Sequence, residues 1–276
     1  MQDQSSGREG DSAAPNIKTI IDEESPFPPI RRVSPVKVFS WLRLGWRDMW
    51  VSPQASLFYG LCFAGMGFLL RIVLSNAPQY LSALSCGFLL LGPLLALGLY
   101  DISRRLESEK TGMLNSLFSM RGRWSNIGIL SLVLAVIMLV WARASLVVFA
   151  LFYNKGMPTM HGFLSQLFSL NNLEFIAVYS CIGFIFASIV FAISWVSIPL
   201  MLDRDTDAIT AMIISTVALF VNIPVTIVWA LTIVSLVVFG FLTYNLGLIF
   251  AMPLVGHATW HAYREVVGRN EDRPSA

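Results

Sequence analysis

The sequence predicts an all-α membrane protein: a polytopic bundle of about six transmembrane helices in three hairpin-like units, with amphipathic surface helices. Three observations support this fold class. Of 276 residues, 55% are hydrophobic and only 13% are charged, about half the charged fraction of a soluble domain. The apolar residues form long runs, and a bilayer core about 30 Å thick needs roughly 20 helical residues to cross it. The basic residues gather in alternate connections between these runs.

The first 34 residues predict a disordered cytoplasmic tail, because they are polar and rich in Pro, Ser, Asp and Glu. They lack the apolar core of a secretory signal. An integral membrane domain is then expected over residues 35–268, and residues 269–276 form a short cytoplasmic C-terminal tail.

Residues Val36–Trp50 predict an amphipathic surface helix. Lys37, Arg43 and Arg47 recur at helical spacing, and apolar or aromatic residues fill most of the other positions. Basic residues on one face and Trp or Phe on the other are typical of a helix that lies in the plane of the lipid headgroups. We therefore expect Arg43 and Arg47 to contact lipid.

Six apolar segments are long enough to cross a bilayer. They are 55–74, 81–100, 127–152, 175–201, 225–243 and 246–266. Only Tyr244 and Asn245 separate the last two segments, so a single long, tilted helix is the alternative there.

The basic residues predict the orientation of these spans. With six spans, both termini and the connections 101–126 and 202–210 share one side. That side carries every Lys and Arg except Arg71, Arg143 and Lys155. Such a positive-inside bias predicts a multi-pass protein of the bacterial inner membrane with both termini in the cytoplasm.

Two shorter segments predict further helices beside the membrane. Gly112–Trp124 is weakly amphipathic, and Ala208–Asn222 is apolar but only 15 residues long. That length suits an interfacial or re-entrant helix better than a crossing. Asp205 or Asp207 is expected to cap the second of these helices.

The second and last spans share an internal repeat. A shift of 160 residues places Gly87, Pro93, Tyr100 and Arg104 over Gly247, Pro253, Trp260 and Arg264. Repeats of this kind occur in transporters, and they also arise by plain duplication. A small-solute transporter or channel that uses the repeat interface is therefore an alternative function.

Several motifs are similar to those of a known family. They are Gly45-Trp46-Arg47-Asp48, Leu91-Gly92-Pro93-Leu94, Tyr100-Asp101-Ile102-Ser103-Arg104-Arg105, Ser197-Ile198-Pro199-Leu200-Met201-Leu202-Asp203-Arg204-Asp205 and Gly256-His257-Ala258-Thr259-Trp260-His261. Together they resemble, over roughly residues 35–268, a bacterial family of integral membrane proteins of unknown function, number 2189 among such families. The resemblance implies a multi-span inner-membrane protein with no established activity. Members are sometimes labelled cytochrome c oxidase subunits.

The number of histidines tests that oxidase label. A haem-copper catalytic subunit holds its metals through about half a dozen imidazoles, whereas this chain has three His. One of them, His161, lies in a predicted external loop. The chain is therefore not expected to be a catalytic subunit, although an accessory role beside an oxidase stays open.

His257 and His261 are the candidate cofactor residues. Their i, i+4 spacing puts both imidazoles on one helix face, where they could hold a haem edge, a copper ion or a proton. The alternative is that they hydrogen-bond to headgroups or to the Ala208–Asn222 helix. We favour the second interpretation because no third ligand is evident, and we expect no cofactor or metal.

Charged residues inside or beside the spans give further candidates for substrate or lipid contact. Arg143 lies roughly 13 Å from the outer end of its span by helical rise. It must snorkel outward, pair with Glu174 or bind an anionic substrate or lipid. Arg104, with Asp101, and Asp203 lie at the predicted cytoplasmic interface, where we expect mutual pairing or contact with surface helices.

These observations favour a non-enzymatic inner-membrane protein that associates with lipid or with another membrane complex. The alternatives are a transporter in which Arg143 faces the substrate, and a haem- or copper-handling factor that uses His257 and His261. No nucleic-acid partner is expected because the formal net charge is only +2. Assembly as a homo-oligomer is left open.

Overall fold

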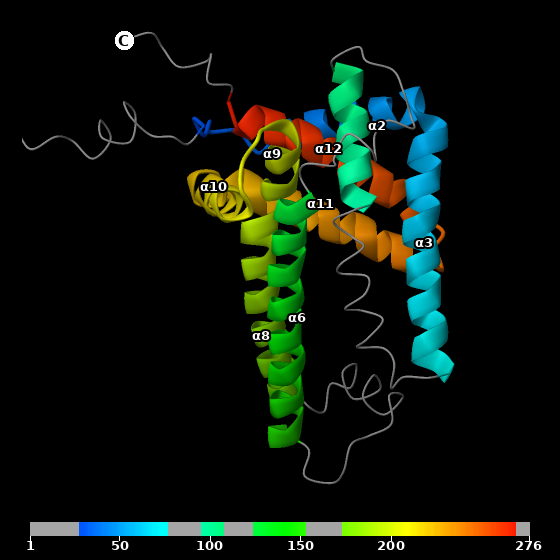
Figure 1. Cartoon of the computed structure of the whole chain (residues 1–276). Helices are drawn as coiled ribbons and strands as arrows, with labels where there is room; N and C mark the ends of the chain where they lie inside the picture. The colour runs from blue at the N-terminus through cyan, green and yellow to red at the C-terminus, as the bar shows by residue number, and fades with distance from the viewer. Residues whose placement is uncertain (1–27, 77–94, 108–123, 153–172, 269–276) are drawn as a thin grey trace, which may run out of the picture.

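The computed structural model describes residues 28–76, 95–107, 124–152 and 173–268 (Figure 1). In these ranges the regular structure is helical, apart from one isolated antiparallel bridge between Ile30 and Val267. A helix over residues 95–107 is drawn in blue-green without a label. The other helices are α2 (Lys37–Val51), α3 (Pro53–Asn76), α6 (Trp124–Phe152), α8 (Leu173–Ser194), α9 (Ser197–Asp203), α10 (Ala208–Val221), α11 (Ile223–Leu242) and α12 (Leu248–Val266). The all-α prediction is confirmed.

Four of the described segments are long and apolar enough to cross a membrane. They are Pro53–Val73, Ser125–Phe152, Leu173–Asp203 and Ile223–Leu242. These segments match the first, third, fourth and fifth predicted spans. Most of the second predicted span, residues 81–94, lies outside the described residues, as does nearly all of Gly112–Trp124.

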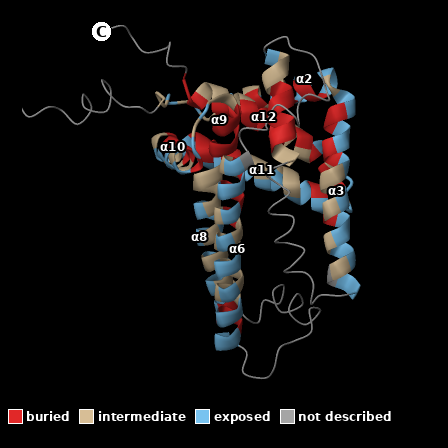
Figure 2. Cartoon of the chain, in the orientation of Figure 1, coloured by how far each residue is buried: buried red, intermediate tan, exposed pale blue. Residues whose placement is uncertain are grey.

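The prediction of a sixth span over residues 246–266 is not borne out. Helix α12 covers most of that segment, but it is not among the helices with the apolar composition of a span. Its second half carries His257, His261 and Arg264, and many of its residues are buried. It runs obliquely from the end of the long helices where α9 lies toward α3 (Figure 1). Figure 2 shows that the buried residues are concentrated at this end.

The chain between α11 and α12 forms a tight turn, so this region is two helices and not one. Tyr244 and Asn245 both have positive φ angles, of 55° and 69°, a conformation that ends a helix because L-residues disfavour it. The guanidinium carbon of Arg71 lies 4.7 Å from the centroid of the Tyr244 ring. This cation–π contact fastens the turn to the end of α3.

Glycines allow α12 to approach its neighbours closely. A Cβ atom at Gly60 of α3 would lie 2.1 Å from the carbonyl oxygen of Ile249, and one at Gly45 of α2 would lie 2.7 Å from the backbone nitrogen of Ala258. Neither position has room for a side chain. Small residues on α3 and α2 therefore let these helices pack closely against α12.

A break in the fourth predicted span is stabilised by α10. Helix α8 ends at Ser194, and α9 begins at Ser197. The backbone N–H of Val196, within the break, donates to Ser215 Oγ of α10 at 3.2 Å. The predicted cap of α10 is confirmed at Asp207, whose side chain accepts a hydrogen bond from the backbone of Thr210.

Residues 29–33 belong to the segment predicted as a disordered tail, yet they pair with the C-terminal end of α12. Backbone hydrogen bonds join them to residues 266–268. Asn222, between α10 and α11, accepts from the backbone N–H of Val33 at 2.8 Å and donates to the carbonyl oxygen of Arg31 at 2.9 Å. This segment therefore acts as a strap across α10, α11 and α12.

Candidate functional site

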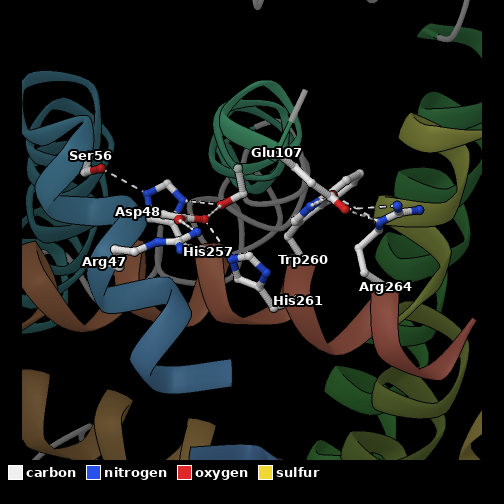
Figure 3. Close-up of polar contacts among 9 residues, drawn as sticks. Arg47, Asp48, Ser56, Glu107, His257, Trp260, His261 and Arg264 are labelled. Carbon is white, nitrogen blue, oxygen red and sulfur yellow. Dashed lines mark hydrogen bonds and ion pairs between the residues drawn. The ribbon is translucent and has the colours of Figure 1, made fainter. Parts of the chain in front are cut away.

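Five polar side chains from four helices form one hydrogen-bonded group, which we call the polar junction (Figure 3). Its members are Asp48 of α2, Ser56 of α3, Ser103 of the helix over residues 95–107, and His257 and His261 of α12. All but His261 are at most 1% exposed, whereas 13% of the His261 side chain is exposed. His261 is therefore the member that connects the group to the surface.

The distances in the polar junction are those of ordinary hydrogen bonds. Asp48 Oδ2 accepts from Ser103 Oγ at 2.8 Å and lies 2.7 Å from His261 Nε2. Ser103 Oγ lies 2.8 Å from His257 Nδ1, and Ser56 Oγ lies 2.9 Å from His257 Nε2. One continuous path of polar atoms thus runs from His261 to the first turn of α3.

Elementary donor and acceptor rules fix the direction of each bond. An ionised Asp48 accepts only, so Ser103 gives its proton to Asp48 and its oxygen accepts from His257 Nδ1–H. Then His257 Nε2 is an acceptor, and Ser56 donates to it. His261 donates to Asp48 through Nε2–H. Every one of these bonds has a donor and an acceptor when Asp48 is ionised and His257 is neutral.

The pKa values agree with those charge states. Burial lowers the pKa of His257 to about 4, although the nearby charge of Asp48 acts in the opposite direction. Burial acts to raise the pKa of Asp48, but the hydrogen bond and charge of His261 and the hydrogen bond from Ser103 outweigh it, and the net shift is downward. At neutral pH the polar junction therefore holds one carboxylate and one uncharged buried imidazole.

The two predicted cofactor residues are thus placed together, with their nitrogens engaged by this chain. Both nitrogens of His257 are bonded to serines, and Nε2 of His261 is bonded to Asp48. Among the residues that the structure describes, no group of three or more His, Cys, Asp or Glu is arranged to hold a metal ion. The geometry favours hydrogen bonding as the role of both imidazoles.

The predicted pairing of Arg104 and Asp101 is confirmed. Asp101 is fully buried and accepts from Arg104 at 2.6 Å and from Arg105 at 2.7 Å. Arg104 also donates to the backbone carbonyl of Leu202 at 2.8 Å. This arginine therefore fixes the helix over residues 95–107 to the end of α9.

The arginine at the equivalent repeat position, Arg264, reaches the same end of α9. Asp203 accepts from Tyr263 Oη at 2.7 Å and from Arg264 at 3.3 Å. Arg264 also pairs with Glu107 at 3.0 Å. Asp203 thus serves contacts within the protein, as expected for a residue at an interface between helices.

The outer face of α2 consists of Phe39, Arg43, Trp46, Arg47 and Trp50. All five side chains are exposed, including Phe39 at 74% and Trp50 at 59%. The prediction that basic and aromatic residues occupy opposite faces is therefore wrong for this helix.

Core packing explains the difference. The inner face of α2 is filled by Val38, Trp41 and Met49, which are buried. Trp41 packs edge-on against Trp229 of α11 with ring centroids 5.8 Å apart, and its indole nitrogen donates to Glu265 at 2.6 Å. Of the three Trp residues of α2, only Trp41 packs in the core, so Trp46 and Trp50 share the outer face with the arginines.

Arg143 is exposed on α6. Within the described ranges, no ion pair joins it to Glu174, which is exposed at the start of α8. Snorkelling of Arg143 stays a prediction.

Sequence reasoning missed Asp48, Ser56 and Ser103. A signal for Asp48 was present: it is an acidic residue one turn after Gly45 on the otherwise apolar inner face of an amphipathic helix. A carboxylate in that position needs donors from a neighbouring element. The two serines carry no comparable signal, because Ser is common in helices of every environment.

Residues 81–203 match the model of a family described as predicted integral membrane protein (DUF2189). This match confirms the resemblance over residues 81–203, and the helix composition is that of a multi-pass integral membrane protein. No curated protein and no solved structure matches the chain.

Proposed function

We propose that this integral membrane protein, whose residues 81–203 match the DUF2189 family, is non-enzymatic and binds anionic lipid through α2. The observation that carries the proposal is the outer face of α2, on which three aromatic side chains alternate with Arg43 and Arg47. An exposed face of this composition is typical of a helix in the lipid headgroup layer.

The position of α2 along the chain supports this placement. Helix α2 ends at Val51, and the candidate span of α3 begins at Pro53. With 15 residues, α2 is too short to cross a bilayer, and its position directly before a span suits the membrane surface. Figure 1 shows α2 at the same end of the long helices as α9 and α12. By the positive-inside rule, this end faces the cytoplasm of a bacterial inner membrane.

The chemistry of the outer face suits anionic headgroups. Trp rings are amphipathic and prefer the headgroup level, and each Lys or Arg near an anionic surface contributes about 1 kcal/mol. A guanidinium also matches the geometry of a phosphate better than an ammonium does. Arg43 and Arg47 thus attract anionic headgroups, and the aromatic rings set the depth of α2 in the membrane.

The inner face of α2 holds the helix rigidly in this orientation. Gly45 packs against Ala258 of α12, Asp48 enters the polar junction, and Lys37 pairs with Glu265 at 2.7 Å. Since His257 and His261 serve the same attachment, the geometry favours lipid binding by α2 over a haem- or copper-handling factor.

The experiment compares thermal unfolding of the full chain in nanodiscs of phosphatidylcholine alone and of phosphatidylcholine with phosphatidylglycerol. We expect the anionic lipid to raise the melting temperature of the wild type, and Arg43→Glu to remove most of that gain. Arg43 is the better target because Arg47 also approaches Asp48, at 3.5 Å.

Arg32→Glu is the matched control. It makes the same charge change at another exposed arginine, outside α2, and should keep the gain. The proposal fails if Arg43→Glu keeps the full gain, or if Arg32→Glu loses as much of it as Arg43→Glu does.

A further inference from the structure

The polar junction connects α2 to three other helices. Its hydrogen bonds are complete when Asp48 is ionised and His257 is neutral. Asp48 comes from α2, and its partners come from the helix over residues 95–107 and from α12. This attachment uses the inner face of α2, whereas lipid binding uses the outer face. The two roles therefore use different side chains.

We propose that the polar junction is a proton-operated latch: proton uptake at acidic pH breaks the Asp48–Ser103–His257 connection and releases α2, while α6 and α8 stay packed.

A proton on Asp48 would disfavour the closed state, in which the polar junction is formed and α2 is attached. Asp48 Oδ2 already accepts from Ser103 and faces Nε2 of His261, and Asp48 is only 1% exposed. A protonated carboxyl group gains an O–H donor, which at Oδ2 would meet the donors Ser103 and His261 and at Oδ1 would face the Arg47 guanidinium, 3.5 Å away and also a donor. A buried donor without an acceptor costs about 1–3 kcal/mol.

A proton on His257 would have a similar effect. Its Nε2 accepts from Ser56, so a new N–H at that atom would face a hydroxyl that is donating. Ser56 would have to rotate, and a cation would occupy a site with no exposure to solvent. The closed state therefore disfavours protons at two linked positions.

Among the described residues, two titratable or charged side chains face Asp48: His261 of α12, 2.7 Å from Oδ2, and Arg47 of α2. On α2, Arg47 lies 3.5 Å from Asp48 Oδ1, and its side chain is 66% exposed. Arg43 is exposed on the outer face of α2. On α2, α12 and the helix over residues 95–107, the remaining charged groups form ion pairs: Asp101 with Arg104 and Arg105, Arg264 with Glu107 and Asp203, and Lys37 with Glu265. Helix α3 carries one charged residue, Arg71, at its far end, and α10 and α11 carry none.

The direction of the switch follows from the shifts described above. Closure lowers the pKa of both His257 and Asp48, so the closed state binds fewer protons than the open state. Acidic pH therefore favours release of α2, and neutral pH favours its attachment through the polar junction.

Release of α2 need not disrupt the long helices. Helices α6 and α8 pack against each other, with Phe149 and Phe175 edge-on at 6.1 Å, and neither contributes to the polar junction. Opening is therefore local, and its signature is a loss of amide protection confined to Lys37–Val51 and its contacts.

The test is hydrogen–deuterium exchange of the full chain in phosphatidylcholine nanodiscs at about pH 7 and about pH 4.5, corrected for the intrinsic pH dependence of exchange. We expect the protection of α2 to fall roughly tenfold or more at the lower pH, with α6 little changed. The neutral lipid keeps this result separate from anionic lipid binding.

Two variants test the roles of His257 and Asp48 in the latch. His257→Gln cannot take up a proton and should lose much less protection on acidification than the wild type. Asp48→Asn should lose protection of α2 already at neutral pH, whereas the matched control Asp207→Asn, at the exposed cap of α10, should respond to pH as the wild type does.

The wild type alone can overturn the latch. Unchanged protection of α2 at the lower pH would do so, and so would a parallel loss in α2 and α6, which is general unfolding. If His257→Gln folds and still releases α2 as the wild type does, His257 is not an acceptor and the latch as stated is wrong.

Discussion

Gly45 of α2 and Ala258 of α12 meet backbone to backbone: a Cβ atom at residue 45 would lie 2.7 Å from the nitrogen of residue 258. This contact sets the register between the two helices. Asp48 lies one turn beyond Gly45, and His257 and His261 flank Ala258, so the same contact brings the carboxylate to both imidazoles.

Gly45→Ala should therefore destabilise the protein. The added methyl group must push α2 away from α12, and overpacking of this kind typically costs about 1–3 kcal/mol. The measurement is the melting temperature of the purified full chain in detergent.

Gly65→Ala is the matched control for that substitution. A Cβ atom at Gly65, in the middle of α3, meets nothing within 4 Å. Alanine is the better helix former by up to about 1 kcal/mol, so this variant should be neutral or slightly more stable. Equal effects of the two substitutions would argue against close packing at Gly45.

Ser103→Ala should weaken the polar junction at neutral pH. It removes one of the two hydrogen bonds to Asp48 Oδ2 and leaves the Nδ1–H of His257 without a partner, and a buried unsatisfied group costs about 1–3 kcal/mol. Denaturant unfolding of the variant should show a loss in that range.

Ser235→Ala provides the comparison. Ser235 is exposed on α11 and donates only to the carbonyl of Leu231 in its own helix, so its loss should change stability by less than about 0.5 kcal/mol. A Ser103 variant as stable as the Ser235 variant would show that the bridge between Asp48 and His257 contributes nothing.

His257 should remain neutral well below the pH at which an ordinary imidazole is charged. Its pKa is about 4 because of burial, against an unperturbed value of about 6.5. Between these values the unfolded state binds more protons, so acidification lowers the stability of the folded state, by roughly 3 kcal/mol if the whole shift is realised.

Nitrogen NMR of the histidine-labelled protein at about pH 6 tests that assignment. Because Ser103 accepts from Nδ1–H, the spectrum should show a neutral imidazole with the proton on Nδ1. A cationic ring, or a proton on Nε2, would contradict the assigned directions of the hydrogen bonds.

Asn222→Ala should loosen the strap at residues 29–33. The side-chain amide of Asn222 makes one hydrogen bond to the backbone of Val33 and one to the backbone of Arg31. Each contributes about 0.5–1.5 kcal/mol net. We expect faster hydrogen exchange at residues 29–33, with α6 unchanged. Asn76→Ala, at an exposed position that bonds only to Ile72 of its own helix, should leave this exchange as it is.

The long helices could be predicted from the sequence because local signals determine them. Apolar length alone locates α3, α6 and α11, and a capping carboxylate at Asp207 locates the start of α10. Each of these signals lies within the element that it predicts.

The polar junction and the orientation of α12 could not be predicted in the same way. Ser103 lies 55 positions from Asp48 and 154 positions from His257, so their contact depends on tertiary packing. Likewise, the selection of Trp41 for the core, which leaves Trp46 and Trp50 outside, depends on the position of Trp229 in a distant helix. Periodicity gives the angle of each residue around a helix but not the neighbour that will cover it.

The depth of α2 in the membrane tests the central claim most directly. A spin label at Phe39, introduced through Cys in a chain whose native cysteines are replaced, would report its accessibility to oxygen and to a water-soluble nickel complex in nanodiscs that contain phosphatidylglycerol. A label at Ile185, exposed on the span of α8, gives the reference for the bilayer interior. We predict that the label at position 39 lies at the level of the headgroups. Full exposure of that label to the aqueous reagent would contradict the proposed lipid-binding role of α2.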